Sequence, residues 1–414
     1  MMTSLLSKLQ TIKAASRKLA AAPSEQRTSA LRAMAEGMKL HKEELLSANC
    51  KDREAAFARS LEQKRINILT IGEKDIEAMS AFFEQAAGYA DPVHKLLESA
   101  EKPGGLKREL RTVPLGVVAV VYEARPSVVT DCAALCMRTG NALLLCGSRH
   151  ARHTDRMLVQ ILQEALCKAG LPEHLITLVE GDHTTNYEIA RQDRLIDLMI
   201  LRGGYTCLAD IKAQATVPVI GAGPGNCHIY IDSSADPEMA KAIVFNSKVP
   251  RPLACNAAET LLIQRDWAEH HLVPLLESLK EADIGIRGCP EVCKKVPWAE
   301  AAGAQDWEEE YFAPLLAVRI LSDVEQAVEH INTFRTPHTE CIITENAENA
   351  DYFMTYVEAN VVCHNASTRL TDGTEFDLGG EMGISTQKYP CGGPIGMEYL
   401  MQKKYLLKGN GTLR

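Results

Sequence analysis

The sequence predicts an α/β protein built from doubly wound parallel sheets. Short runs of β-branched and apolar residues, typical of strands buried on both faces, alternate with amphipathic helical segments between residues 116 and 214. The same alternation resumes between residues 228 and 364, after a glycine-rich stretch. Repeated strand–helix units of this kind form parallel sheets, because each helix returns the chain across one face of the sheet. A chain of 414 residues is also long enough for more than one domain.

The first 90 residues are expected to be helical. Apolar residues recur at helical spacing on both sides of Pro23-Ser24, which marks the start of a new helix, and Asp91-Pro92 ends the helical region. Residues 1–22 carry four cations and no acid, which is also compatible with a mitochondrial transit peptide. We interpret this segment as a helix of the mature protein, because the helical pattern continues past Pro23, and we expect a cytoplasmic protein.

The remaining elements follow from the same patterns. Charged and apolar residues alternate from Leu106 to Val113, as in an exposed hairpin strand. The strands expected in the first sheet are 116–122, 142–146, 175–179 and 196–201, and those expected in the second are 228–232, 260–264, a strand ending near 320, 341–344 and 361–364. The connecting helices are expected at 129–139, 154–169, 184–191, 205–214, 236–246, 267–280 and 324–332.

The glycine-rich stretch Gly221–Gly225 is the expected hinge between domains. We expect a domain over 1–226, a second domain over 227–366, and a C-terminal segment over 367–414 that contains a long irregular loop. Irregular segments of that length in compact proteins are usually functional.

Composition excludes several classes of function. The net charge of −9 argues against a nucleic-acid-binding protein, which normally carries a basic surface. The sequence has no apolar run near the ~20 residues that a membrane-spanning helix needs. Its 13 cysteines follow neither a metal-binding spacing nor a disulfide framework, so we expect no metal and a reducing compartment.

A proline-stiffened loop carries the candidate nucleophile. Cys255 follows Pro250 and Pro252 and stands directly before an apolar run, with Lys248 and Arg251 a few residues upstream. Nearby positive charge stabilises a thiolate, which is the nucleophilic form of cysteine. The alternative is a small buried hydrophobic residue, which is a frequent role of cysteine.

Three glycines stand where ligands bind in parallel sheets. Gly147 follows the second expected strand and Gly203-Gly204 follows the fourth, at the carboxyl ends of the strands. They permit close approach of a dinucleotide, with helix N-termini facing its phosphates. The alternative is an ordinary turn, and no GxGxxG fingerprint follows the first strand.

Several sequence blocks, in this order, resemble one known family. The blocks are VPLGVVAVVYEARP (113–126), GNCHIYID (225–232), ACNAAETLL (254–262), NASTR (365–369), GISTQK (383–388) and GPIGMEYL (393–400). They are similar to those of the γ-glutamyl phosphate reductases, a family of the aldehyde dehydrogenase superfamily, and the similarity covers nearly the whole chain.

The resemblance implies a reaction. Members of the family reduce L-glutamyl 5-phosphate with NADPH to glutamate 5-semialdehyde and phosphate, in proline biosynthesis. Cys255 matches the family's nucleophile, which forms a thioester. Hydrolytic members of the superfamily carry Glu-Leu-Gly-Gly, whereas this chain reads Ile220-Gly221-Ala222-Gly223 and lacks the water-activating glutamate. Glu123–Pro126 stands where the superfamily has an oxyanion-binding asparagine, so the second oxyanion donor is left unassigned.

The same resemblance implies cofactor residues. Glu310 matches the glutamate that binds the nicotinamide ribose, and Gly203-Gly204 matches the family's Arg-Gly-Gly turn. The turn after the second strand reads Cys146-Gly147-Ser148-Arg149, so the family's basic residue is missing there. Arg149, with Arg152 or His150, is the expected partner of a 2′-phosphate. The choice between NADP and NAD stays open, and a solvated helix face is the alternative role for these cations.

Cations and hydroxyls are expected around the substrate, which carries a carboxylate, an ammonium group and a phosphate. The candidate substrate-binding residues are Arg125, Lys248, Arg251, Asn365, Ser367, Thr368 and Arg369. Arg369 has a structural ion pair as its alternative role. Ser127 and Pro250 depart from the family's usual Asn and Gln beside this site.

The resemblance also implies assembly and partners. We expect a homodimer or homotetramer, formed through an arm that combines residues 98–113 with a C-terminal strand in 396–414, and functional coupling to glutamate 5-kinase. Two other functions are kept as alternatives: an aldehyde dehydrogenase acting on another acyl substrate, and a catalytically silent binding or assembly protein.

Overall fold

The computed structural model describes residues 2–103, 105–203 and 205–413 and divides into two compact units. The first contains residues 1–222, 377–383 and 395–414, and the second contains residues 223–376 and 384–394. The division falls between Ala222 and Gly223, inside the expected glycine-rich hinge.

The first unit begins with a layer of helices. Its helices are α1 (Met2–Ala20), α2 (Ser24–Leu40), α3 (Lys42–Ala58), α4 (Gln63–Leu69) and α5 (Glu73–Gly88). Pro23 stands directly before α2, where its fixed φ suits the turn into a helix. The apolar face of α2, with Leu31, Met34 and Met38 fully buried, packs against α5 and α7. The helical pattern of the first 90 residues is therefore confirmed.

The first unit contains a five-stranded parallel sheet. Its strands are β3 (Val117–Tyr122), β4 (Ala142–Cys146), β5 (Ile176–Leu178), β6 (Leu198–Arg202) and β7 (Val219–Ala222), in the order β5-β4-β3-β6-β7. The helices α6 (Ser127–Thr139), α7 (Arg152–Lys168), α8 (His183–Ala190) and α9 (Tyr205–Gln214) connect them. The order runs outward from β3 in both directions, and such sheets bind ligands at the carboxyl ends of their strands, where the order reverses.

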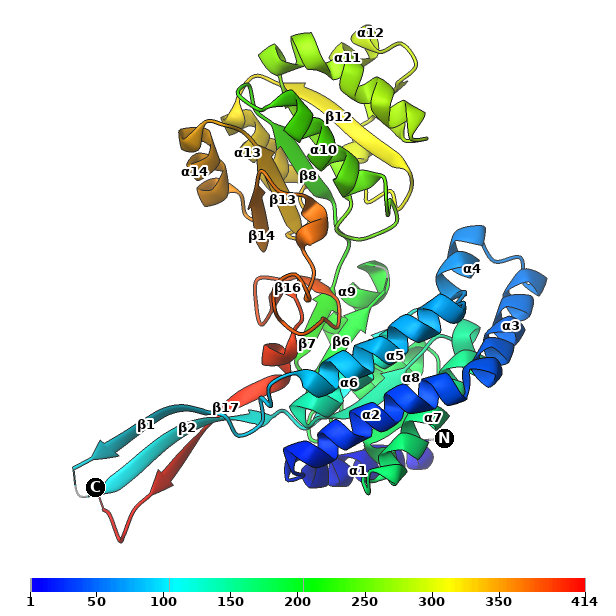
Figure 1. Ribbon diagram of the computed structural model, residues 1–414, viewed down its shortest axis with the longest axis vertical. Helices are drawn as coiled ribbons and strands as arrows, with labels where there is room; N and C mark the ends of the chain where they lie inside the picture. Colours follow the sequence, from blue (N-terminus) through cyan, green and yellow to red (C-terminus); the bar gives the residue numbers. More distant parts are fainter. Residues whose placement is uncertain (1, 104, 204, 414) are drawn as a thin grey trace. The chain divides into compact units, whose positions relative to one another are not determined.

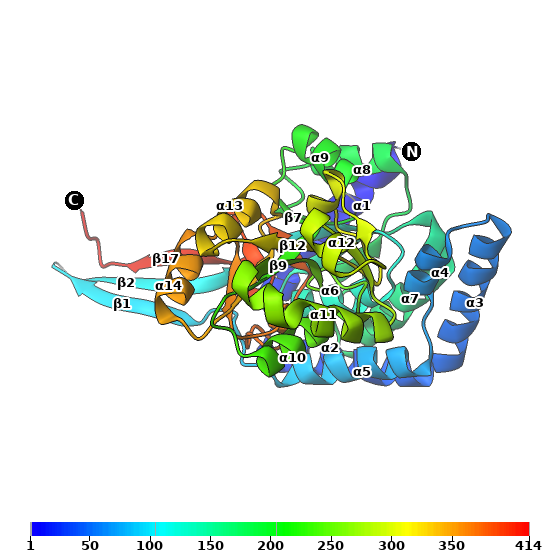
Figure 2. The ribbon, with the colours of Figure 1, turned by 90° about the horizontal axis from the view of Figure 1, so that it is seen from above.

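Three antiparallel strands form an arm on the first unit. The strands are β1 (Leu96–Lys102), β2 (Leu106–Pro114) and β17 (Met401–Lys408), with β2 between the other two. They lie side by side in both views (Figure 1, Figure 2). Glu109 is buried within the arm and pairs with Arg111 at 2.9 Å and with Lys408 of β17 at 3.2 Å. The structure thus pairs the expected 98–113 arm with the expected C-terminal strand.

The second unit contains a seven-stranded parallel sheet. Its strands are β8 (Cys227–Ile231), β9 (Ala258–Gln264), β10 (Gly285–Gly288), β11 (Glu300–Ala301), β12 (Leu315–Leu321), β13 (Thr339–Ile343) and β14 (Val361–His364), in the order β11-β10-β12-β9-β8-β13-β14. Its helices are α10 (Pro237–Lys248), α11 (Arg265–Glu281), α12 (Pro290–Lys295), α13 (Val324–Phe334) and α14 (Ala347–Tyr356). Asp236 caps α10 by accepting from the Met239 N–H at 2.8 Å, as its sequence position predicts.

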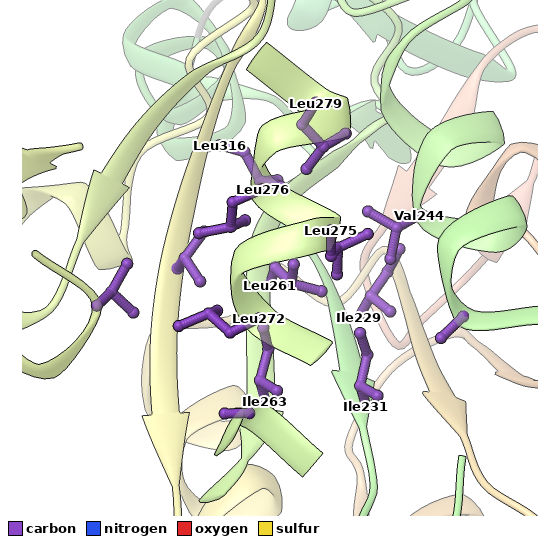
Figure 3. Packing of buried hydrophobic residues seen from close by; sticks show 14 of the residues in the cluster. Ile229, Ile231, Val244, Leu261, Ile263, Leu272, Leu275, Leu276, Leu279 and Leu316 are labelled. Atoms are coloured by element: carbon purple, nitrogen blue, oxygen red, sulfur yellow. The ribbon is translucent and has the colours of Figure 1, made fainter. Parts of the chain in front are cut away.

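Apolar clusters cover both faces of this second sheet. On one face, leucines of α11 and Val244 of α10 pack on Ile229, Ile231, Leu261 and Ile263 of β8 and β9 (Figure 3). On the other face, Tyr230 and Leu262 of the same strands pack against α13 and α14. This two-sided burial explains the continuous apolar runs in the sequence.

Two features differ from the sequence-based expectation. The segment 367–414 is not a unit of its own, because hydrogen bonds hold its first residues to the second unit while β17 pairs with β2 of the first. Several elements had no counterpart in the prediction: β7, β10, β11, α12, α14 and the short hairpin β15 (Ile384–Thr386) with β16 (Gly392–Pro394). Most are too short for a hydrophobic period to show, and β7 ends in the first two residues of the glycine-rich stretch.

Candidate active site

Cys255 lies in a turn directly before β9 and is half-buried. The main chain of the turn packs on the residues that enter β8. The Cys227 thiol donates to the Cys255 carbonyl oxygen at 3.4 Å, and a Cβ atom on Gly225 would stand 1.8 Å from that oxygen. Burial raises the pKa of Cys227, so this side chain stays a thiol and a donor. The entry to β8 therefore fixes the peptide group of the candidate nucleophile.

The loop that follows β14 holds the Cys255 turn from another side. Asn256 is buried and donates to the Thr371 carbonyl at 2.9 Å, while the Thr368 hydroxyl donates to the Asn256 carbonyl at 2.7 Å. Ser367 and Ser247 share a hydrogen bond at 2.9 Å, which ties the loop to the end of α10. Ser367 and Thr368, expected to bind substrate, are buried and position the turn through these hydrogen bonds.

Arg251 and Arg369 supply positive charge beside Cys255. Arg251 is exposed and Arg369 is partly exposed, and neither guanidinium forms an ion pair with any residue that the structure describes. Burial lowers the pKa of Arg369, the Arg251 charge lowers it further, and Cys255 raises it, which places the three groups within electrostatic reach of one another. Two guanidiniums close to a cysteine favour its thiolate.

Lys248 lies beneath the loop. Its ammonium and the Glu259 carboxylate are both fully buried and stand 2.7 Å apart. Burial lowers the pKa of Lys248, and the neighbouring Glu259 charge raises it. The sequence-based expectation was that Lys248 binds the substrate. In the structure Lys248 instead forms a buried ion pair that joins α10 to β9.

Breaking this ion pair is expected to destabilise the second unit. Lys248→Met leaves the Glu259 carboxylate buried and without its cation, which should lower the free energy of unfolding by about 3–5 kcal/mol. The double variant Lys248→Met with Glu259→Gln should recover most of that loss. Urea unfolding measures both, with exposed Lys241→Met on the same helix as the control. A loss below about 1 kcal/mol in the single variant would contradict the assignment.

Asn365 stands away from Cys255. Its side chain accepts from the Thr344 N–H at 2.9 Å and donates to the Thr344 carbonyl at 3.0 Å, just past the carboxyl end of β13. Cys255 precedes β9 and therefore lies at the amino end of the same parallel sheet. The expected polar clamp on the substrate is not supported, because Asn365 instead closes a turn in the left-handed region, at φ 53°.

Glu310 lies in the second unit, shortly before β12. Its charge raises the pKa of both Lys248 and Cys227, which places it near the base of the Cys255 turn. Arg125 is exposed in the first unit, between β3 and α6. Their expected roles in binding the nicotinamide ribose and the substrate stay predictions.

A cavity of about 420 Å³ opens in the first unit at the carboxyl ends of β3, β4 and β6. It is lined by four of the residues expected to bind cofactor, Gly147, Ser148, Arg149 and Gly203. Gly204 lies outside the described residues. The volume is within the range of ligand sites, and the position is the one at which parallel sheets bind dinucleotides.

Buried polar groups shape the floor of this cavity. The Tyr122 hydroxyl donates to Asp155 at 2.9 Å, and a Cβ on Gly147 would stand 2.3 Å from the same carboxylate. Gly147 is therefore required by local packing. The Asp52 carboxylate of α3 accepts from the His153 and Thr154 N–H groups at 3.1 and 2.8 Å. His153 and Thr154 belong to the first turn of α7. The expectation that the N-terminus of α7 faces a phosphate is thus not met, because the Asp52 carboxylate already accepts hydrogen bonds from its N–H groups.

Asp155 gives a testable dependence of stability on pH. Burial raises its pKa from the ordinary 3.8 to about 8. Between pH 3.8 and about 8 the folded protein keeps the proton and the unfolded chain loses it. The free energy of unfolding should therefore fall by about 1.4 kcal/mol for each unit by which the pH rises. Asp155→Asn carries no titrating proton and should lose this contribution to the slope when urea unfolding is compared from pH 5 to pH 7.5.

Asp182→Asn is the control for that experiment. Asp182 caps α8, and the Thr185 N–H that it accepts lowers its pKa, so it is ionised in both states across this range. Parallel pH profiles for Asp155→Asn and the unmodified protein would contradict a neutral Asp155 in the folded state.

No group of three or more His, Cys, Asp or Glu side chains that could hold a metal ion was found among the residues described. Within the same residues, no helix combines the length and apolar character needed to cross a bilayer.

Comparisons with known proteins define the class. The model of the aldehyde dehydrogenase family matches residues 7–292 and 300–404. An acetylating aldehyde dehydrogenase from Geobacillus thermoglucosidasius has the same fold, with a TM-score of 0.72 at 17% identity, over 100% of this chain and 98% of that one. Both comparisons confirm the predicted aldehyde dehydrogenase-like α/β architecture.

Closer relatives define the group within that class. A γ-glutamyl phosphate reductase from Bacillus velezensis is 43% identical over 100% of both chains, and one from Bacillus subtilis is 43% identical over 93% of both. The crystal structure of γ-glutamyl phosphate reductase from Thermotoga maritima matches with a TM-score of 0.93 at 34% identity, covering 99% of each chain. The chain therefore belongs to the γ-glutamyl phosphate reductases of the aldehyde dehydrogenase family.

Proposed function

We propose that this protein reduces L-glutamyl 5-phosphate to L-glutamate 5-semialdehyde and phosphate with NADPH, as a step of proline biosynthesis. It would thus act as a glutamate-5-semialdehyde dehydrogenase. The observation that carries the proposal is the placement of Cys255 beside Arg251 and Arg369, in a chain that matches γ-glutamyl phosphate reductases over its whole length.

The Cys255 thiolate is the nucleophile. It attacks the acyl carbonyl carbon, the carbon–oxygen bond to phosphate breaks, and phosphate leaves with the electron pair, so that the glutamyl group is held as a thioester. Arg251 and Arg369 support this step in two ways. Their charge stabilises the attacking thiolate, and guanidinium groups bind carboxylate and phosphate oxygens in pairs.

The turn around Cys255 supplies the positioning. The backbone of Gly225 packs closely against the Cys255 carbonyl, and the Cys227 thiol donates to it. The Thr368 hydroxyl donates to the carbonyl of residue 256, so the turn is fixed before any substrate binds. Fixed geometry of this kind contributes to rate because the reacting atoms need not be ordered during the reaction.

The acyl group is proposed to exchange with phosphate and not with water. Ile220 and Ala222 of β7 occupy the part of the sequence where hydrolytic relatives carry the water-activating glutamate. Neither side chain can take a proton from water. Phosphate is therefore the acyl partner in both directions of the reaction.

Members of the aldehyde dehydrogenase family use a nicotinamide cofactor, and the residues of the first unit fit one. The cavity at the carboxyl ends of β3, β4 and β6 combines close-packed glycine backbone with exposed guanidiniums, as a dinucleotide's phosphates require. When bound, the dinucleotide supplies the hydride that reduces the thioester to the aldehyde. Arg149 on the rim supports NADPH as the cofactor.

The protein is proposed to assemble through its arm and to act in the cytoplasm. The exposed edge strands of the arm carry Leu96, Tyr405 and Leu407 at the surface, which supports a homodimer or homotetramer formed through it. Every cysteine whose side chain is described is a free thiol, which supports the cytoplasm. Functional coupling to glutamate 5-kinase follows from the substrate, because an acyl phosphate is supplied by a kinase acting on a carboxylate.

The reverse reaction tests the proposal. Glutamate 5-semialdehyde and NADP are expected to sustain steady-state NADPH formation only when inorganic phosphate is present. Formation of NADPH at the same rate without phosphate would mean that water accepts the acyl group. No NADPH formation under any condition would overturn the proposed substrate.

A further inference from the structure

Two arginines from separate elements stand on the rim of the first-unit cavity. Arg65 of α4 and Arg149, which begins the short 3₁₀ turn Arg149–Ala151, line it together with His150. Both guanidiniums are exposed, and neither forms an ion pair within the described chain. By contrast, Arg152 and Arg156 farther along α7 pair with Glu180 at 3.2 and 2.6 Å.

Packing fixes Arg65 to this rim. Ile66, next to it in sequence, belongs to a buried cluster with Ala56, Leu69 and Ala151, and Leu61 packs against the same cluster. Ala151 is the last residue of the turn that begins at Arg149, so α4 and this turn share one apolar contact. Asp52 of α3 accepts a hydrogen bond from the Thr154 N–H of α7, which ties α3 to the same rim of the cavity.

The charge on this rim is concentrated. Burial lowers the pKa of His150, and the charges of Arg149, Arg59 and Arg65 lower it further, in that order. Three guanidiniums thus act on one imidazole in a chain whose net charge is −9. The Asp52 charge acts on His150 in the opposite sense. Arg65, Arg149 and Arg202 line the cavity together with two carboxylates, Glu123 and Asp182, and such a local excess of positive charge favours an anionic ligand.

The end of β4 contributes no charge of its own. Cys146 is 4% exposed, and burial raises the pKa of its thiol to about 12, so it is neutral at physiological pH. A cation that meets a phosphate at the end of β4 therefore comes from another element, and the arginines that line the cavity are Arg149 of the following turn, Arg65 of α4 and Arg202 of β6.

We propose that Arg65 and Arg149 together bind the 2′-phosphate of NADP, so that the α3–α4 layer helps to select NADP over NAD. The inference rests on the proposed function, and it adds Arg65 as a specificity-determining residue. Two planar guanidiniums on one phosphate provide several charge-assisted hydrogen bonds, which NAD, with a hydroxyl at that position, cannot form.

The test uses binding probes that need no catalysis. Calorimetric titration with 2′,5′-ADP and with 5′-AMP isolates the 2′-phosphate from the rest of the dinucleotide. Arg65→Gln and Arg149→Gln should each raise the Kd of 2′,5′-ADP by about tenfold or more, because each removes hydrogen bonds to a charged group. The Kd of 5′-AMP should change by less than about twofold in both variants.

Arg156→Gln is the matched control. It removes a guanidinium on the next turn of α7 that already pairs with Glu180, and surface pairs of this kind contribute little to stability. It should leave the Kd of both probes within about twofold. Arg65→Lys should retain part of the affinity for 2′,5′-ADP, because the charge remains but the planar fork is lost.

The possible outcomes separate this inference from the proposed function. An unchanged Kd of 2′,5′-ADP in Arg65→Gln overturns the role of Arg65, and equal weakening of both probes overturns it as well, since the arginine would then act on the fold of the cavity. Failure of the unmodified protein to bind NADP, 2′,5′-ADP and 5′-AMP would reject the dinucleotide site and the proposed function together.

Discussion

Replacing Cys255 with serine is expected to lower kcat/KM for NADPH formation in the reverse reaction by roughly 10⁴-fold or more. A serine hydroxyl is not ionised near neutral pH, and the two arginines that favour a thiolate cannot compensate for a much higher pKa. The overall structure should be retained, because the two side chains have nearly the same shape and Cys255 is only half-buried.

The exposed cysteines provide controls for this variant. Cys50→Ser and Cys167→Ser remove thiols of α3 and α7 that are more accessible than Cys255, and both should retain full activity. Iodoacetamide near neutral pH should inactivate the unmodified protein by modifying Cys255 first, which peptide mass mapping would detect. Retention of more than about a tenth of the activity in Cys255→Ser would reject the covalent mechanism.

Gly225→Ala is expected to have the second-largest effect. A Cβ at this position would stand 1.8 Å from the Cys255 carbonyl oxygen and 2.9 Å from its carbonyl carbon, so the main chain of the turn must move. A displacement of about 1 Å in a reacting group costs on the order of 10² in rate, and we expect kcat to fall by at least that factor. The free energy of unfolding should fall by only about 1–3 kcal/mol.

Gly88→Ala is the control for Gly225→Ala. Gly88 ends α5, and a Cβ there would meet nothing within 4 Å, so alanine should fit and should leave kcat unchanged. Steady-state kinetics and urea unfolding on the two variants separate a positional effect from general destabilisation. Wild-type kcat in a folded Gly225→Ala would show that the turn can relax without losing its geometry.

Much of the fold could be predicted from local sequence patterns. The strands β3, β4, β8 and β9 are buried on both faces, so their apolar runs carry a strong signal. The short strands β10 and β11 carry none, and β7 ends in a Gly-Ala pair that favours a hinge more than a strand. The hinge and the strand are both present, since the division between the units follows β7 directly.

The site was predictable only in part. Cys255 and Arg369 stand in recognisable sequence blocks and Arg251 lies shortly before one, but the roles of Ser367 and Thr368 depend on which groups they meet in the fold. The Lys248 cation looked available in the sequence, because its partner Glu259 lies 11 residues later and on another element. A one-dimensional pattern cannot show that two such charges are buried together.

Some residues to which we assign roles carried no sequence signal at all. Cys227 is one of 13 cysteines, and only the register of β8 against β9 places it at the Cys255 turn. Arg65 lies in a short polar helix more than 80 residues before Arg149. The α3–α4 layer brings them to one cavity through the buried contact of Ile66 with Ala151, which is a tertiary effect.

The central claim is that the acyl group passes through Cys255 and leaves to phosphate. The most direct test mixes the enzyme rapidly with glutamate 5-semialdehyde and NADP in the absence of phosphate. We predict a burst of about one NADPH per active site, a covalent adduct on Cys255 detectable by intact mass spectrometry, and continued turnover only after phosphate is added. Continuous NADPH formation without phosphate, or a burst with no adduct on Cys255, would contradict the account.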